Sequence, residues 1–314
     1  MILITGGGGF FGRNIAKYLV DQGKQVLLLQ RSPFEIPSFL AAHWDKQVKA
    51  VRGDVQSLPF LLGLVKDYDI ESIIHLAGIS RGAKLPAHEI IQVNVTGTVN
   101  VLEAARIFRL RRVTFASSNT IYHGINNPPD GPYKEDLDLP VVNTRGGFIP
   151  YTKKAAEQLC LLYSKEYNLS VCLVRGGNGY GPASRYDNPP DVMVPDAFQG
   201  KAVDFRHTPE NSTLTPVYIK DLARGYGLVH LAESPGHNIY NISSGKRYAF
   251  SEIVQMIKEF LPRAEIHLGP PSAHVDLFCP SIERARNDLG YVPDYPDFRE
   301  GLRAYIDYLK FGKY

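Results

Sequence analysis

Three glycines near the start of the chain have the spacing of a phosphate-binding turn. Residues 1–12 read MILITGGGGFFG, in which Gly6, Gly9 and Gly12 give the pattern G-x-x-G-x-x-G. The turn lies between an apolar run and an amphipathic run, so it would join a strand to the start of a helix. Backbone N–H groups and the positive helix end would face a bound anion there, and glycine lets a pyrophosphate approach closely. We therefore expect a dinucleotide to bind at this turn.

Apolar runs and helical patterns alternate through the first half of the chain and would position the glycine turn. Apolar runs predict strands at 1–4, 25–29, 49–52, 72–77, 113–116 and 170–174. Amphipathic stretches predict helices at 13–22, 59–66, 95–107 and 153–167. Because nearly continuous apolar strands separated by helices indicate a parallel sheet covered on both faces, we predict an α/β fold with a Rossmann-type doubly wound parallel sheet. Ligands of such sheets bind beyond the carboxyl ends of the strands, where the glycine turn, Asp54 and Ser118 would lie.

The sequence changes in character after Gly181 and Pro182. Proline and aspartate become frequent, and helical patterns return at 221–231, 251–260 and 298–309, with Ser251 as the expected N-cap of its helix. We expect residues 1–180 to form a dinucleotide-binding domain to which the chain returns in parts of 215–250. Residues 181–314 would mainly form a smaller C-terminal α+β lobe that selects the substrate.

Composition excludes several classes of protein. The 314 residues are 44% hydrophobic with a net charge of +3, and the basic cluster at 109–112 is expected to be a solvated helix end rather than a nucleic-acid patch. No apolar stretch approaches the roughly 20 residues of a membrane span, and because a strand is predicted to start at Met1, we expect no signal peptide. Cys160, Cys172 and Cys279 lack metal-ligand spacing. We expect a cytoplasmic protein with reduced cysteines and with no metal, nucleic-acid or membrane partner.

Eight short segments follow one another in a fixed order. They are TGGGGFFG at 5–12, GDV at 53–55, HLAG at 75–78, NVTGTVNVLEAA from Asn94, SSNTIY at 117–122, RGGNGYGP at 175–182, YIKDLA at 218–223 and DLGYVP at 288–293. In this order they resemble the motifs of the extended short-chain dehydrogenase/reductase family, the NAD(P)-dependent epimerase/dehydratase group. The resemblance covers nearly the whole chain.

The resemblance implies a nicotinamide dinucleotide and the residues that would hold it. His75, inside an apolar strand, is expected to be structural. The predicted cofactor-binding residues are Gly6, Gly9, Phe10, Phe11, Gly12, Gln30, Arg31, Ser32, Asp54, Val55, Leu76, Ala77, Gly78, Asn94 and Lys153.

The end of the second predicted strand bears on the choice between NAD and NADP. An acidic residue there would accept a hydrogen bond from the ribose 2′-hydroxyl of NAD and repel the additional phosphate of NADP. This chain has Gln30 at that place, followed by Arg31 and Ser32. Since arginine suits phosphate well, we predict NADP as the preferred cofactor, with NAD possible.

The catalytic motif that the resemblance implies is interrupted in this chain. The family uses Tyr-x-x-x-Lys and a Ser or Thr, and Ser118 takes the Ser/Thr place. Tyr151 follows Pro150 as in the motif, yet the residue four positions later is Ala155. Counting back from Glu157, which precedes Arg175 by the family's eighteen residues, puts Lys153 in the lysine place and Ile149 in the tyrosine place.

Three interpretations of this interruption are open. Tyr151 could reach the site from an irregular helix start beside Pro150 and act with Lys153 or the next lysine. Alternatively, the site has no phenol, and Ser118, residues 119–120 or substrate groups do different chemistry. In the third interpretation the cofactor binds without redox catalysis. We predict the first, with Tyr151 as proton donor, Lys153 on the nicotinamide ribose and Ser118 on the substrate oxygen.

Three functions are compatible with this site. The first is an oxidoreductase that moves a hydride to or from a carbinol or carbonyl carbon of a small polar substrate. The alternatives are a nucleotide-sugar epimerase and a non-catalytic NAD(P)-binding sensor or scaffold. Dehydratases of the family have Thr-Asp-Glu where residues 118–120 read Ser-Asn-Thr, and its sugar-nucleotide enzymes tend to have arginines where this chain has Leu214 and Pro271. These differences favour the first function, and Ile149 keeps the third open. The resemblance also implies a homodimer formed through the helices at 95–107 and 153–167.

Overall fold

Seven parallel strands form one central sheet in the structure, a computed structural model that describes residues 1–79, 85–123, 125, 129–139, 147–184, 188–273 and 278–314. Their order is β11-β6-β5-β4-β1-β2-β3, and each neighbouring pair is parallel. Their bounds are β1 (Ile2–Thr5), β2 (Val26–Gln30), β3 (Val48–Arg52), β4 (Ser72–His75), β5 (Arg112–Ala116), β6 (Val171–Gly176) and β11 (Ile239–Ile242). The strand order reverses between β1 and β4, so the predicted doubly wound fold is confirmed.

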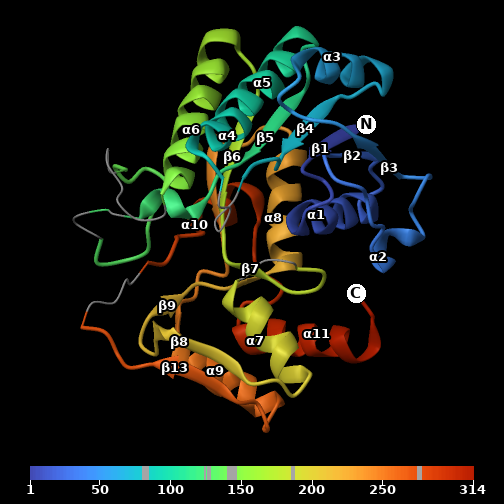
Figure 1. Ribbon diagram of the computed structural model, residues 1–314. Helices are drawn as coiled ribbons and strands as arrows, with labels where there is room; N and C mark the ends of the chain where they lie inside the picture. The colour runs from blue at the N-terminus through green and yellow to red at the C-terminus, as the bar shows by residue number, and fades with distance from the viewer. Residues whose placement is uncertain (80–84, 124, 126–128, 140–146, 185–187, 274–277) are drawn as a thin grey trace.

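Helices cover both faces of the sheet (Figure 1). One face carries α1 (Phe10–Asp21), α2 (Ser38–Ala41), α8 (Ile219–Leu231) and α10 (Glu283–Leu289), and the other carries α3 (Leu58–Asp67), α5 (Gly97–Ile107) and α6 (Phe148–Tyr167). In β1, Ile2 and Ile4 pack into the first layer and Leu3 into the second, because successive strand residues point to opposite faces. Burial on both faces explains why inner strands such as β1 are mostly apolar, whereas the edge strand β3 has exposed Lys49 and Arg52.

A smaller lobe lies beside the carboxyl edge of the sheet (Figure 1). It contains α7 (Pro189–Phe198), α9 (Phe250–Phe260), α11 (Phe298–Phe311) and the strands β7 (Gly179–Tyr180), β8 (Val203–Pro209), β9 (Thr213–Leu214), β10 (Val217–Tyr218), β12 (Tyr248–Ala249) and β13 (Ile266–Gly269). Met193, Ile257 and Leu302 are fully buried in its core. The domain boundary at residue 180 stays a prediction. Two elements that follow it in the sequence, β11 and α8, belong to the central sheet and to the helical layer that covers it.

The helices α6 and α9 do not begin where the sequence predicts. Helix α6 begins at Phe148 rather than at residue 153, because Pro150 falls in the first turn, where its missing N–H costs nothing. Helix α9 begins at Phe250, so the expectation that Ser251 caps it was wrong. The N–H groups of Phe250 and Ser251 instead donate to the backbone oxygens of Ser212 and Glu210, both at 2.9 Å. These backbone contacts, together with Glu252, whose carboxylate accepts from the Ala249 N–H at 2.6 Å, therefore take the place of a Ser251 cap.

The basic cluster at 109–112 is only in part the solvated helix end that the sequence suggested, since Arg109 and Arg111 are exposed just after α5. Arg112 is buried, and its guanidinium donates to the backbone oxygens of Val229 and His230 at 3.3 and 3.2 Å. Arg111 donates to His230 O at 3.2 Å. The two cations thus satisfy the carbonyl end of α8, where positive charge is favourable.

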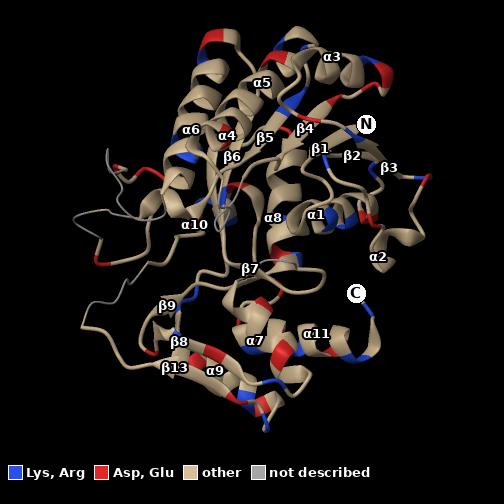
Figure 2. Cartoon of the chain, viewed as in Figure 1, with Lys and Arg blue, Asp and Glu red and all other residues tan. Residues whose placement is uncertain are grey.

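Charges of both signs are interspersed over the two parts of the chain (Figure 2), so the net charge of +3 is not gathered on one element. Among the described residues, no helix has the length and apolar character needed to cross a membrane. All three cysteines are free thiols, with Cys160 and Cys172 buried and Cys279 partly buried.

Candidate active site

The glycine turn lies between β1 and α1 and is too tight for side chains. Gly6 has φ +67°, and a Cβ there would lie 2.8 Å from the backbone nitrogen of Ala77. A Cβ on Gly12 would lie 2.7 Å from the backbone oxygen of Gly6. Gly9, at the N-cap of α1, offers no side chain to the first turn. The turn therefore fits a bound pyrophosphate, with the N-terminal end of α1 (Phe10 and Phe11) facing the anion.

The ends of β2 and β3 form the neighbouring part of the site. The Gln30 amide nitrogen donates to the backbone oxygens of Ser32 and Pro33 at 2.8 and 2.9 Å. Its amide oxygen lies over the glycine turn, 1.2 Å from where a Cβ on Gly8 would be. Gln30 thus shapes the loop that carries Arg31, whose side chain is 64% exposed. This loop is the place where the phosphate or hydroxyl on an adenosine ribose would be distinguished.

Asp54 and Val55 follow β3, and Asp54 faces this loop. One Asp54 oxygen accepts from the backbone N–H of Gln56 at 2.9 Å, and the other lies 3.9 Å from Arg31 Nη1. Val55 is buried against Gly97, where a Cβ would lie 2.8 Å from its side chain. Asp54 therefore both caps a turn and lies within reach of the predicted adenosine position.

His75 and the residues after it connect β4 to the glycine turn. His75 is completely buried, with Nδ1 2.6 Å from Thr5 Oγ1 and Nε2 3.1 Å from Thr98 Oγ1. The Ala77 N–H donates to the same Thr5 oxygen at 3.2 Å. Burial lowers the pKa of His75 to about 3. As predicted, His75 is a neutral structural residue, and it fixes the Leu76–Ala77–Gly78 backbone beside the glycine turn.

Asn94 lies in a short π-helix, η1 (Gln92–Thr96), between α4 (Ala87–Ile91) and α5. Its amide oxygen accepts from Ile79 N–H at 2.7 Å, and its amide nitrogen donates to Ile79 O and Thr152 Oγ1 at 3.1 and 3.0 Å. Asn94 therefore ties the chain after β4 to α6. π-Helical turns often occur at functional sites.

Lys153 brings a cation to the ends of β4 and β5. Its Nζ donates to Ala116 O at 2.6 Å and lies 4.9 Å from the centre of the Phe115 ring. It is 3.5 Å from where a Cβ on Gly78 would be, so Lys153, Gly78 and Asn94 meet at one place. Burial lowers the pKa of the Lys153 amine to about 8.

Ser118 lies two residues beyond the Ala116 oxygen that Lys153 contacts, and it caps the short helix η2 (Asn119–Tyr122). The Thr120 N–H and hydroxyl donate to Ser118 Oγ at 3.1 and 2.9 Å. These bonds leave the Ser118 proton available for another oxygen.

Tyr151 and Ile149 lie on different faces of α6. Ile149 packs against the apolar cluster of Ile79, Ile90 and Val93. Tyr151 is 37% exposed, whereas Lys153, two residues later, points toward β5. The structure thus brings Ser118 and Lys153 to one edge of the sheet, and the role of Tyr151 stays a prediction.

The sequence analysis did not predict the buried charges behind this edge. The Arg175 guanidinium donates to both Glu157 carboxylate oxygens at 3.0 and 2.9 Å. It also donates to Tyr122 Oη at 2.9 Å and Glu135 O at 2.8 Å. The only sequence signal for this ion pair was the eighteen-residue spacing of Glu157 and Arg175, which we used to align Lys153 with the lysine of the family's catalytic motif.

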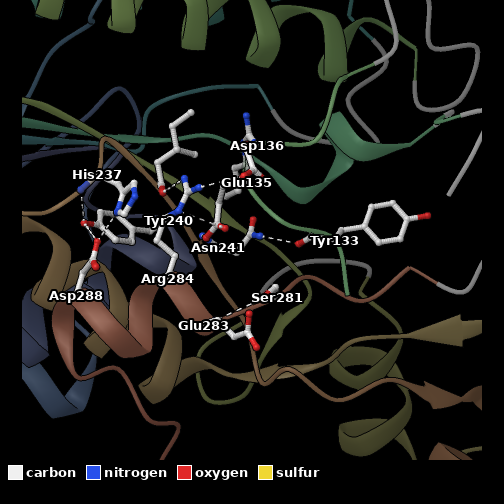
Figure 3. Close-up of polar contacts among 12 residues, drawn as sticks. Tyr133, Glu135, Asp136, His237, Tyr240, Asn241, Ser281, Glu283, Arg284 and Asp288 are labelled. Atoms are coloured by element: carbon white, nitrogen blue, oxygen red, sulfur yellow. Dashed lines mark hydrogen bonds and ion pairs between the residues drawn. The ribbon is translucent and has the colours of Figure 1, made fainter. Parts of the chain in front are cut away.

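A second group of polar contacts attaches residues 133–136 to β11 and α10 (Figure 3). Glu135 accepts from the Asn241 N–H at 2.8 Å, and its other oxygen lies 3.7 Å from Arg284 Nε. Asn241 also accepts from Tyr122 Oη at 2.9 Å and donates to Tyr133 O at 3.0 Å. The short helix that Ser118 caps is thereby anchored to the far edge of the sheet.

Comparison with known proteins agrees with this arrangement. Residues 2–243 match the model of the NAD dependent epimerase/dehydratase family. The chain belongs to this family. It is 27% identical over 326 residues to a UDP-glucuronate 4-epimerase of Thermodesulfobacterium geofontis, and the alignment covers 98% of this chain and 95% of that protein. It is also 27% identical to a 2-alkyl-3-oxoalkanoate reductase of Stenotrophomonas maltophilia, covering 96% and 97%.

Solved structures show the same fold. The structure of MoeE5 in complex with UDP-glucuronic acid and NAD has a TM-score of 0.82 and 27% sequence identity, with 99% of each chain covered. The UDP-glucose 4-epimerase of Thermotoga maritima with UDP-glucose has a TM-score of 0.84 at 20% identity, with 98% of each chain covered. These neighbours share the fold of the chain, and the family match makes it an enzyme of the NAD dependent epimerase/dehydratase type.

Proposed function

We propose that this protein is a nucleotide-sugar epimerase, the alternative that the sequence analysis placed second. The observation that carries the proposal is the close match over the full length to MoeE5, solved with UDP-glucuronic acid and NAD. The relationship to a UDP-glucuronate 4-epimerase supports the same substrate class. Membership in a family of enzymes favours catalysis over the sensor or scaffold alternative.

The described residues fit this reaction. The glycine turn would hold the pyrophosphate of the dinucleotide, and Lys153 and Asn94 would position the nicotinamide end. Bound nicotinamide supplies a hydride acceptor and donor, so that a carbinol carbon is oxidised and then reduced from the other side. Ser118 would hold the substrate oxygen through its available proton.

Direct conversion tests the proposal. Purified protein with NAD and UDP-glucuronic acid or UDP-glucose should give the 4-epimer, detected by NMR, without net formation of reduced cofactor. Matched incubations of Ser118→Ala should convert about 10²-fold more slowly. Absence of any new sugar in both incubations would contradict the proposal.

One observation favours the oxidoreductase that the sequence analysis placed first. Leu214 packs against the core of the small lobe, at the place where sugar-nucleotide enzymes of the family tend to have an arginine. The related reductase of Stenotrophomonas maltophilia is consistent with this function. Accumulation of reduced cofactor in step with substrate loss would identify this activity.

We also propose that the protein binds NADP more tightly than NAD. Arg31, Ser32 and the neutral Gln30 favour NADP, and the Arg52 side chain joins them through a hydrogen bond from Nε to Arg31 O at 2.8 Å. The solved relatives with bound cofactor contain NAD. Calorimetric titration should give a lower Kd for NADP than for NAD, and Arg31→Ala should remove the difference. Equal affinities in the unmodified protein would contradict this preference.

We also propose a homodimer formed through α5 and α6. Large apolar side chains are exposed at Ile107 at the end of α5 and at Leu162 and Tyr167 on α6. Such side chains, clustered on neighbouring helices, favour a protein interface. Sedimentation at micromolar concentration should give a dimer, and a monomer would contradict it.

A further inference from the structure

The regular start of α6 separates the predicted proton donor from the site lysine. Because the helix is continuous from Phe148, residues two apart differ by about 200° around its axis and residues four apart share a face. Ile149 therefore shares the Lys153 face and packs against apolar side chains. Tyr151 lies on another side of the helix and is 37% exposed.

The Lys153 amine is buried, and the carboxylate that acts on it, Glu157, is also paired with Arg175. The contacts of the amine are the Ala116 oxygen at 2.6 Å and the Phe115 ring. Titratable groups that interact electrostatically with it come from two elements: Glu157 and Cys160 on α6 and neutral His75 on β4. Both oxygens of Glu157 are held by Arg175, so that carboxylate is shared with a second cation. The ion pairs formed by the described residues do not include Lys153.

We infer that the Lys153 amine itself exchanges the proton with the reacting substrate hydroxyl, with Ser118 bonded to the same substrate oxygen. The inference rests on the proposed function. During oxidation the carbinol C–H electron pair leaves as hydride to the nicotinamide, and the O–H proton passes to the neutral amine, which gives a carbonyl and an ammonium. The reverse step returns the proton to the oxygen as the carbon is reduced.

The geometry and chemistry of the site agree with this role. Burial holds the Lys153 pKa near 8, so both protonation states are populated close to neutral pH, as an acid–base group requires. The Ser118 oxygen already accepts two hydrogen bonds from Thr120, so its own proton can orient the substrate oxygen. No step requires a phenol.

The substitution Lys153→Arg distinguishes a role of residue 153 in proton exchange from a role of its positive charge alone. Arginine keeps the positive charge and can donate to Ala116 O, but it stays protonated at any accessible pH. We expect Lys153→Arg to bind NAD with a Kd within several-fold of the unmodified value and to lose turnover by about 10²-fold or more. Lys165→Arg, at an exposed position on the same helix, is the matched control and should keep turnover.

Titration of the amine gives a readout that is independent of activity. In protein labelled with ¹⁵N-lysine, one amine signal should titrate near pH 8 and should be missing in Lys153→Arg. A Lys153 amine that stays charged to pH 10 overturns the inference, and so does wild-type turnover in Lys153→Arg. Loss of turnover in Tyr151→Phe with little loss in Lys153→Arg assigns the proton to the phenol instead. Failure of the unmodified protein to convert either nucleotide sugar would contradict the proposed function, in a separate measurement from the titration.

Discussion

The Glu157–Arg175 pair joins the helix that carries Lys153 to the strand beside it. The two side chains are 0% and 4% exposed, and the guanidinium satisfies both carboxylate oxygens, Tyr122 Oη and Glu135 O. Removing one charge leaves the other buried without compensation. We expect Arg175→Met to lower the free energy of unfolding by about 3–5 kcal/mol in urea denaturation.

The exposed pair Arg299–Glu259 provides the control for this prediction. Its nitrogen and oxygen atoms lie 2.8 Å apart, but both side chains are about half exposed. Arg299→Met should change unfolding far less than Arg175→Met, because water replaces the lost partner. Equal destabilisation by the two substitutions would contradict the importance of burial.

Ile149 provides a gain-of-function test of the site. Ile149→Tyr would place a phenol four residues before Lys153, on the same face of α6. The larger ring should cost about 1–3 kcal/mol of stability by overpacking the cluster of Ile79, Ile90 and Val93. If the new phenol donates the proton, residue 153 needs only a positive charge, which arginine also supplies. The loss of turnover caused by Lys153→Arg should therefore be smaller in the Ile149→Tyr background than in the unmodified protein. The same loss in both backgrounds would show that the new phenol does not take part.

At the scale of elements, the junction of β1 with α1 determines dinucleotide binding. A Cβ on Gly12 would lie 2.7 Å from both Gly6 O and Gly7 Cα, which are backbone atoms that cannot move independently. We expect Gly12→Ala to displace α1, weaken NAD binding at least about tenfold and cost about 1–3 kcal/mol. Calorimetric titration and urea denaturation measure the two effects.

Gly63 in α3 is the matched control for Gly12. A Cβ there meets no atom within 4 Å. Gly63→Ala should raise stability by about 0.5–1 kcal/mol, because alanine favours the helix, and should leave NAD binding unchanged. Weakened NAD binding in both variants would show that the effect is not specific to the turn.

The sequence predicted elements that are long enough to show a local pattern, and it missed features that depend on distant partners. Six of the seven strands of the sheet and the glycine turn were predictable because their patterns are local, whereas β11 was not predicted as a strand. The start of α6 was missed since Pro150 suggests a break, although a first turn tolerates it. The two-residue strands β9 and β12 have no periodicity and exist only through their pairing, in which Leu214 lies opposite Tyr248. Arg112 was misassigned because its carbonyl partners in α8 lie more than 100 residues away.

At the scale of the molecule, side chains at the start of α8 attach the small lobe to the sheet. Asp221 accepts from the backbone N–H groups of Asp294 and Tyr295 at 2.7 and 3.0 Å. These residues lead into α11, which packs in the core of the lobe. The sequence placed Asp221 in a family motif, but its partners could be identified only from the fold. The lobe that is predicted to select the substrate is therefore held directly by a helix of the dinucleotide-binding layer.

Tyr314, beyond the end of α11, makes a second connection between the lobe and the sheet layer. Its ring stacks on Phe39 with centroids 4.1 Å apart, and its hydroxyl bonds to Asn14 of α1. The Lys220 ammonium lies 4.4 Å from the ring centre. We expect Tyr314→Ala to destabilise the protein by about 1–3 kcal/mol in thermal and urea unfolding, from lost apolar burial and stacking. Phe311→Ala, at a side chain that is 68% exposed, should have little effect, and an equal loss in the two variants would contradict a specific role for Tyr314.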